Sequence, residues 1–152
     1  MHEYSDPGWE LVTDRVMGGL SAGAVERVDA VGTTATRLNG CVSLENNGGF
    51  VQMVADIAPP PAAAKGVAMM LAGNGETYNI HLRTTDLSRP LQSYRHEFSA
   101  PAQWTLCHFA FGDFKPHRTE KLFDKSRISR IGIVAIGRVF DADVSVGNVS
   151  YY

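Results

Sequence analysis

Alternating apolar and polar positions dominate the chain, whereas the spacing of an amphipathic helix is nearly absent. In residues 77–84, the apolar Tyr78, Ile80 and Leu82 alternate with polar side chains. A second alternating run covers residues 93–99, and a polar stretch over residues 86–92 separates the two runs. Because successive side chains of a strand point to opposite faces, the two runs predict a β-hairpin with one apolar and one polar face.

Strand signals also recur elsewhere, with turn residues between them. They cover residues 24–28, 34–44, 50–57, 66–72, 103–111, 128–137 and 143–151. The run 131–136 is apolar at successive positions, which favours a strand covered on both sides. Pro59-Pro60-Pro61 marks a linker, because proline has no backbone N–H to donate to a sheet. Only residues 119–127 are compatible with a short helix.

This pattern predicts one all-β domain over residues 1–152, with its core at about 9–151. We expect an antiparallel β-sandwich, specifically a jelly roll, with about nine short strands and at most one short helix.

Composition and charge narrow the classes of function. The 152 residues are 44% apolar and 20% charged, as in a globular domain. The net charge of -2 argues against a nucleic-acid partner, since such binding relies on an excess of Lys and Arg. No run approaches the ~20 apolar residues of a transmembrane helix, and no signal peptide is visible. We therefore expect a cytoplasmic protein, unless it docks on a membrane complex through a partner.

The first glycine-rich segment is Asp14-Arg15-Val16-Met17-Gly18-Gly19-Leu20-Ser21. Adjacent glycines allow positive φ, and exposed N–H groups in such a turn can bind an anion or a partner. The alternative is a corner of the sandwich in which Asp14 and Arg15 form a local ion pair. The candidate binding residues are Asp14, Arg15, Met17, Gly18, Gly19 and Ser21.

The second glycine-rich segment is Leu44-Glu45-Asn46-Asn47-Gly48-Gly49-Phe50. Asn-Gly favours a tight hairpin turn between strands that end near Leu44 and begin near Phe50. The functional alternative is a second binding loop that lies beside the first, with Arg15 facing Glu45. Its candidate binding residues are Glu45, Asn46, Gly48 and Gly49.

The polar face of the predicted hairpin is an alternative site for a carbohydrate or another small ligand. Its side chains are Asn79, His81, Arg83, Arg95 and Glu97. The aromatic residues available to stack on a sugar are Trp9, Trp104, Tyr78 and Tyr94, although the two tyrosines fall on the apolar face. A solvated sheet face without a ligand explains the same pattern.

Catalytic and metal chemistry have little support. The five histidines lack zinc-binding spacing, no Ser lies in a nucleophile elbow, and no pair stands out among the 16 carboxylates. We therefore predict no catalytic residue, no metal and no cofactor, with a hydrolase that uses Glu45, Glu97 or an Asp as a minor alternative. Cys41 and Cys107 could pair, but thiols of a chain without an export signal usually stay reduced.

The order of motifs carries a family resemblance. The chain has Trp9, the segments 14–21, 38–40 and 42–50, then Gly73-Asn74-Gly75 before Tyr78, Leu82-Arg83-Thr84, Trp104, residues 109–116 and Ile131-Gly132-Ile133. This series resembles the complex I intermediate-associated protein 30 family, in the form of bacterial stand-alone domains. The domain that defines this family occurs in an assembly factor of NADH:ubiquinone oxidoreductase.

The resemblance implies a galactose-binding-like jelly roll without catalysis. Its partner would be a protein, namely an assembly intermediate of complex I. Loops at one end of a rigid sandwich suit such a role. We therefore expect both glycine-rich loops to bind the partner, and Arg15→Ala with Glu45→Ala to abolish binding without lowering the melting temperature. The carbohydrate-binding module remains the alternative.

Overall fold

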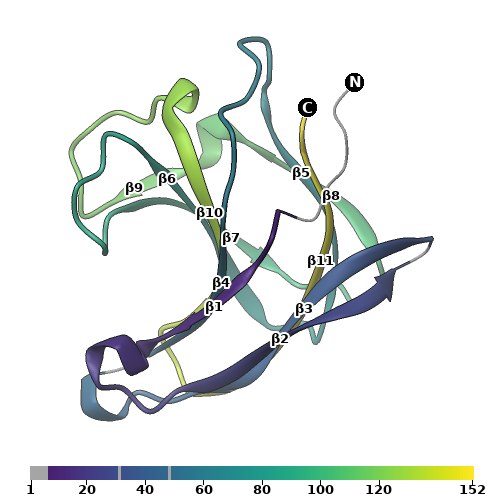
Figure 1. Cartoon of the computed structure of the whole chain (residues 1–152), viewed down its shortest axis with the longest axis vertical. Helices are drawn as coiled ribbons and strands as arrows, with labels where there is room; N and C mark the ends of the chain where they lie inside the picture. The colour runs from purple at the N-terminus through teal and green to yellow at the C-terminus, as the bar shows by residue number, and fades with distance from the viewer. Residues whose placement is uncertain (1–6, 31, 48) are drawn as a thin grey trace.

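The computed structural model describes residues 7–30, 32–47 and 49–152 of the chain. Within them, two antiparallel sheets pack face to face as a sandwich (Figure 1). One sheet has six strands in the order β1-β4-β10-β6-β7-β9, and the other has five in the order β2-β3-β11-β5-β8. The strands are β1 Glu10–Thr13, β2 Ala22–Ala30, β3 Thr33–Val42, β4 Phe50–Asp56, β5 Gly66–Gly73, β6 Thr77–Thr84, β7 Ser93–Ser99, β8 Thr105–Ala110, β9 Lys115–His117, β10 Ile128–Ile136 and β11 Phe140–Tyr151.

The predicted all-β sandwich is confirmed, with eleven strands in the described residues rather than about nine. The hairpin of β6 and β7 has the predicted bounds, and both strands pair antiparallel. The two strands that the sequence pattern missed, β1 and β9, form the two edges of the six-stranded sheet. They have four and three residues, too few to show an alternation.

The short helix proposed for residues 119–127 is wrong. Only its last residues turn, as the 3-10 helix η4, Lys125–Arg127, which Asp124 caps by accepting a hydrogen bond from the Ser126 N–H. The described residues contain three other 3-10 turns: η1 Asp14–Met17, η2 Glu45–Asn47 and η3 Phe111–Asp113.

The tight hairpin proposed between Leu44 and Phe50 is also wrong. β3 and β4 belong to different sheets, and η2 carries the chain from one sheet to the other. Asn46 turns the chain there with a φ of 55°. The Asn and Gly residues therefore serve a corner between sheets.

The core lies between the sheets and takes the apolar side of each strand. Tyr78, Ile80 and Leu82 of β6 are all 0% exposed. The Tyr78 hydroxyl accepts a hydrogen bond from the Asp143 N–H of β11 at 2.9 Å and donates one to the Asn74 side chain at 2.6 Å. A buried tyrosine thus links one sheet to the other through a hydrogen bond. Burial of each large apolar side chain contributes about 1.5–3 kcal/mol to the free energy of unfolding.

Candidate functional site

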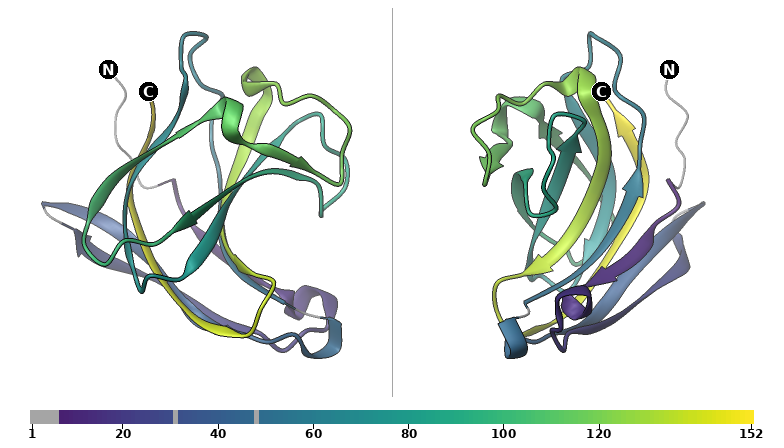
Figure 2. Two further views of the ribbon diagram at one scale, coloured as in Figure 1. Left: turned by 180° about the vertical axis from the view of Figure 1, so that it is seen from behind. Right: turned by 60° about the vertical axis from the view of Figure 1, so that its left-hand side comes forward.

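The two glycine-rich loops do lie side by side, at one end of the sandwich (Figure 2). The carboxylate of Asp14, which is 0% exposed, joins them. Its Oδ1 accepts from the Ser21 N–H at 3.0 Å, and its Oδ2 from the Ser21 hydroxyl at 2.5 Å. From the second loop, the N–H groups of Gly49 and Phe50 donate to Oδ2 at 2.6 and 3.2 Å. Asp14 is therefore a link within the fold.

The surroundings of Asp14 explain the pattern of the first loop. Burial raises the pKa of Asp14, but the hydrogen bonds from Ser21, Gly49 and Phe50 outweigh burial and lower it below its usual value. A Cβ atom on Gly19 would lie 2.4 Å from Asp14 Cγ, so this position has no room for a side chain. Asp14, Gly19 and Ser21 thus form one structural unit.

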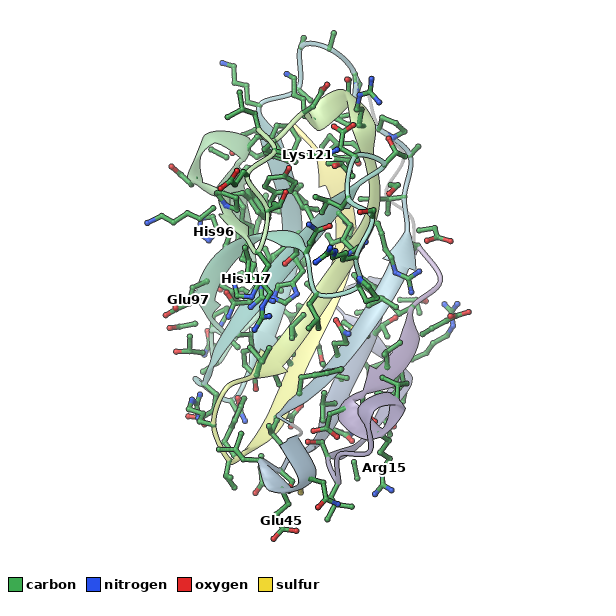
Figure 3. All side chains as sticks on the ribbon, turned by 90° about the vertical axis from the view of Figure 1, so that its left-hand side faces the viewer. Arg15, Glu45, His96, Glu97, His117 and Lys121 are labelled. Atoms are coloured by element: carbon green, nitrogen blue, oxygen red, sulfur yellow. The ribbon has the colours of Figure 1, made fainter. Side chains whose placement is uncertain are left out.

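Arg15 and Glu45 project from this end of the molecule (Figure 3). The Arg15 Nε donates to the Ser21 carbonyl at 2.9 Å. No ion pair joins Arg15 to Glu45, so the proposed pairing across the loops is absent from the described residues. Asn46 and Gly18 are exposed too, whereas Gly48 and the side chain of Met17 lie outside the described part of the chain.

A groove of about 690 Å³ runs over the outer face of the six-stranded sheet. Strands β1, β4, β10, β6 and β7 form its floor, and η1 and the loop before β7 contribute to its rim. The lining residues are Val12, Val16, Phe50, Gln52, Val54, His81, Arg83, Pro90, Leu91, Gln92, Ser93, Arg95, Arg130, Ile131, Gly132, Val134 and Ile136.

The part of the groove near η1 is apolar. Val12, Gln52 and Val134 lie in register on β1, β4 and β10. Val16, which is 74% exposed, adds an aliphatic side chain from η1. Among the described residues that line the groove, Phe50 is the one Phe, Tyr or Trp. Gly132 leaves the floor open, because a Cβ atom there would meet its neighbours only at 3.4 Å and beyond.

Arg83 holds the rim on the other side. Its Nη1 donates to the carbonyls of Arg89, Pro90 and Gln92, at 2.9, 3.1 and 2.5 Å. The Gln92 side chain accepts from the Ser88 and Arg89 N–H groups. The loop that presents Leu91, which is 47% exposed, is therefore fixed by hydrogen bonds.

The same end of the groove is basic. His81, Arg83, Arg95 and Arg130 line it, and their strands β7, β6 and β10 are neighbours in the sheet. Burial, with Arg95 and His117 nearby, lowers the pKa of His81 to about 3, so its ring is neutral at pH 7. Burial also lowers the pKa of Arg83 and Arg95, and neighbouring arginines lower both further. Positive charge is thus concentrated here.

The predicted polar face is partly the wall of this groove. His81, Arg83 and Arg95 line it, whereas Asn79 and Glu97 share the outer face without lining it. Tyr78 and Tyr94 are buried in the core, and neither tryptophan lines the groove.

Sequence reasoning missed the residues of β1, β4 and β10 that form the floor. The available signal was the continuous apolar run 131–136, whose outward residues Gly132 and Val134 cover the centre of the groove.

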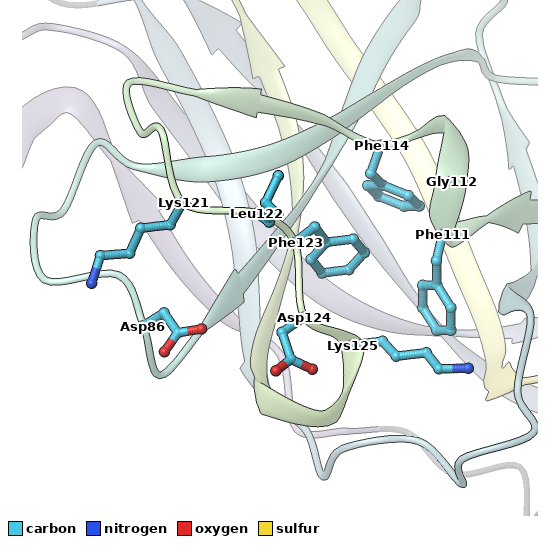
Figure 4. A pocket seen from close by; sticks show the side chains of 9 residues that line it. All are labelled: Asp86, Phe111, Gly112, Phe114, Lys121, Leu122, Phe123, Asp124 and Lys125. Atoms are coloured by element: carbon cyan, nitrogen blue, oxygen red, sulfur yellow. The ribbon is translucent and has the colours of Figure 1, made fainter.

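A second hollow, of about 910 Å³ and more open to solvent, lies at the other end of the sandwich (Figure 4). Phe111 and Phe114 beneath it are 7% and 6% exposed, and their rings contact Phe123 edge-on and at a tilt, respectively. Lys125 at its edge donates to the carbonyls of Ala62 and Ala64, at 2.7 and 2.6 Å. These rings and charges are used within the fold, so the groove is the better candidate site.

The described residues give little support for a metal site. No group of three metal-ligating side chains comes together there. His81 lies on the outer face, whereas His96 contacts the core rings Phe109 and Phe114. Cys41 and Cys107 are free thiols. Among the described residues, no helix has the length and apolar character needed to span a membrane.

Comparison with solved structures supports the fold. The family 11 carbohydrate-binding module from Clostridium thermocellum, in complex with a β-1,3-1,4-mixed-linked tetrasaccharide, superposes with a TM-score of 0.77 at 9% identity, over 94% of this chain and 87% of that chain. The family 30 module of the cellulosomal cellulase Cel9D-Cel44B of the same organism gives 0.64 at 12% identity, over 87% and 89%. These likenesses concern the β-sandwich alone.

Comparison with curated proteins gives no match. The family model of complex I intermediate-associated protein 30 matches residues 2–146, which is nearly the whole chain. The matched residues include Asp14, Gly19 and Ser21, the unit that joins the two loops. The chain therefore belongs to the complex I intermediate-associated protein 30 family.

Proposed function

We propose that the chain is a non-catalytic binding domain that holds a segment of a partner protein in the groove of the six-stranded sheet. The groove carries the proposal, because it joins aliphatic side chains to cations on one rigid sheet. Family membership supports an assembly intermediate of complex I as the partner. The loops at the η1 end then form the rim, where Arg15 and Glu45 add charge selectivity.

The lining favours a peptide over a sugar. Sugar recognition usually relies on flat aromatic platforms, and Phe50 is the one Phe, Tyr or Trp among the described residues of the groove. Val16 and Leu91, with the partly buried Val12 and Ile136, offer aliphatic contacts instead. An extended peptide can fill such a surface with alternate side chains while its polar groups meet the rim.

The test is a pull-down of the tagged chain from membranes of its own host, with mass spectrometry of the captured proteins. We expect complex I subunits to be enriched by the natural sequence. Val16→Asp with Leu91→Asp should abolish the capture, because both side chains line the groove and are exposed enough to be replaced without unfolding.

Leu122→Asp with Val139→Asp is the matched control. These residues are 89% and 70% exposed and lie away from the groove. The control should capture as the natural chain does. Equal capture by both double variants, or no respiratory protein in any sample, would contradict the proposal.

Arg15→Ala with Glu45→Ala tests the rim. We expect a several-fold weaker capture and a melting temperature within a few degrees of the natural chain, since Arg15 makes its side-chain hydrogen bond to one carbonyl. A large loss of melting temperature would instead make both residues structural.

A carbohydrate ligand is the second candidate. The polar side chains Gln52 and His81 within the groove favour it, because sugars need hydrogen-bonding groups beside apolar contacts. Binding on a glycan array that Arg83→Ala abolishes would support it. Silence across a broad array would leave the protein partner.

A further inference from the structure

The basic end of the groove brings arginine side chains together on neighbouring strands of the sheet. His81 of β6 lies directly opposite Arg95 of β7, and Arg83 of β6 lies opposite Arg130 of β10. Arg83 and Arg130 carry like charges, and such pairs opposite one another on neighbouring strands destabilise a sheet. The fold alone does not explain this arrangement.

Arg83 and Arg95 also lack counter-charges among the described residues. Arg83 donates to backbone carbonyls, and the Arg95 Nε donates to the Ser93 hydroxyl at 2.9 Å. Neither pairs with a carboxylate anywhere in the described residues. Arg130 has a carboxylate at 3.5 Å, that of Asp56, whose side chain is 86% exposed. The terminal nitrogens of Arg95 therefore remain available to a ligand.

His81 is incomplete in the same place. Its Nε2 is buried and has no hydrogen-bond partner among the described residues. Burial opposes its protonation, as do Arg95 of the neighbouring strand β7 and His117 of β9, the strand beyond β7. A bound anion would supply the missing partner and would offset the repulsion.

We propose that His81, Arg83, Arg95 and Arg130 form a carboxylate-recognition site, which binds an Asp or Glu side chain of the segment held in the groove. This inference rests on the proposed function, that the occupant is a protein. Charge complementarity selects the acid, because a guanidinium presents paired N–H groups that match the two oxygens of a carboxylate. The aliphatic part of the groove then selects Val, Leu or Ile beside it.

The experiment is selection of a random dodecapeptide phage library on the full chain. We expect the enriched peptides to carry Asp or Glu within a few residues of aliphatic side chains. The strongest peptide is then synthesised twice, once as selected and once with its carboxylates replaced by amides. The amide version should bind at least about tenfold more weakly, since hydrogen bonds to charged groups are the stronger ones.

Two protein variants locate the site. Arg95→Gln with Arg130→Gln should weaken the selected peptide about tenfold. Arg127→Gln with Arg138→Gln makes the same change in net charge away from the groove and should leave binding within about twofold. Should the first variant fail to fold, Arg130→Gln alone serves, because its side chain is at the surface. In the complex, NMR should show the pKa of His81 raised above its free value.

Several outcomes would overturn the site. These are no enrichment, a consensus without acidic residues, equal loss in both double variants, or an unchanged His81 pKa on binding. The proposed function fails separately. If acidic peptides are selected but the pull-down captures no complex I subunits, the carboxylate site stands and the respiratory partner is excluded. If complex I subunits are captured but no acidic peptides are selected, the groove stands and the carboxylate site is excluded.

Discussion

The two ends of the six-stranded sheet treat buried polar groups in opposite ways. At the η1 end, every oxygen of the buried Asp14 carboxylate accepts hydrogen bonds from the two loops. At the basic end, the buried Nε2 of His81 has no partner in the described residues, and Arg95 and His117 oppose protonation of its ring. A buried polar group whose hydrogen bonds are made organises the fold, whereas one without a partner marks a place where a ligand can add stability.

Asp14→Ala should give the largest loss. It would leave the N–H groups of Ser21 and Gly49 without acceptors, and we expect about 4 kcal/mol less free energy of unfolding. Urea denaturation measures the change. Asp113→Ala, at an exposed acid, is the control and should stay within about 0.5 kcal/mol. A loss under about 1 kcal/mol for Asp14→Ala would mean that the loops do not depend on this carboxylate.

The pH dependence of stability separates the two ends. The folded pKa of His81, about 3, lies below its ordinary value of 6.5, so the unfolded chain takes up the proton first as the pH falls. Stability should therefore drop below pH 6.5, by about 2 kcal/mol at pH 5. Asp14 has a lowered pKa as an acid, so its contribution persists to below pH 3.8 and is lost only there.

Urea denaturation of the natural chain and of His81→Gln at pH 7, 6 and 5 checks this. The free energy of unfolding of His81→Gln should fall much less between pH 7 and pH 5 than that of the natural chain. Parallel curves for the two proteins would assign the decline to other groups, His117 first among them, since its pKa is also lowered.

Paired and unpaired arginines should respond differently to the same substitution. Arg37, on the outer face of the five-stranded sheet, contacts both oxygens of Asp143 at 2.8 Å and Glu26 at 2.9 Å. Since these side chains are partly exposed, Arg37→Gln should lower the free energy of unfolding by about 1 kcal/mol. Arg95→Gln should leave it unchanged or raise it slightly, because repulsion is relieved. Equal losses in both variants would contradict the contrast.

Local patterns predicted the strands well. The alternation in β6 and β7 gave their bounds, because each strand buries one face and the period of two is read directly from the sequence. The Asn-Gly pair near Asn46 misled, since a local turn signal does not specify which sheet receives the next strand. β9, with the sequence Lys115-Pro116-His117, has no strand-forming residue and pairs with β7 only through the fold.

The candidate site was less accessible to sequence reasoning. His81, Arg83 and Arg95 could be found because they lie on one hairpin. Val12, Gln52 and Val134 come from three strands far apart in the chain, and only their register brings them together. Asp14 shows the converse, because a carboxylate beside glycines has the same sequence signature whether it binds a partner or joins two loops.

The smallest expected effect concerns Gly132, in the floor of the groove between the two ends. A Cβ atom at Gly132 meets Gln52 at 3.4 Å, an ordinary contact, so Gly132→Ala should fold normally and gain about 0.5 kcal/mol by restricting the unfolded chain.

The new methyl group projects into the groove and should weaken the selected acidic peptide several-fold, measured by calorimetry. Gly112→Ala is the matched control, because a Cβ atom there meets nothing within 4 Å and the residue lies outside the groove. It should show a similar gain in urea and unchanged binding. Weaker peptide binding by Gly132→Ala without a loss of stability would show that the groove binds the peptide independently of any effect on folding. The charged substitutions at either end cannot show this alone. Unchanged binding by Gly132→Ala would mean that the peptide does not lie over the centre of the sheet.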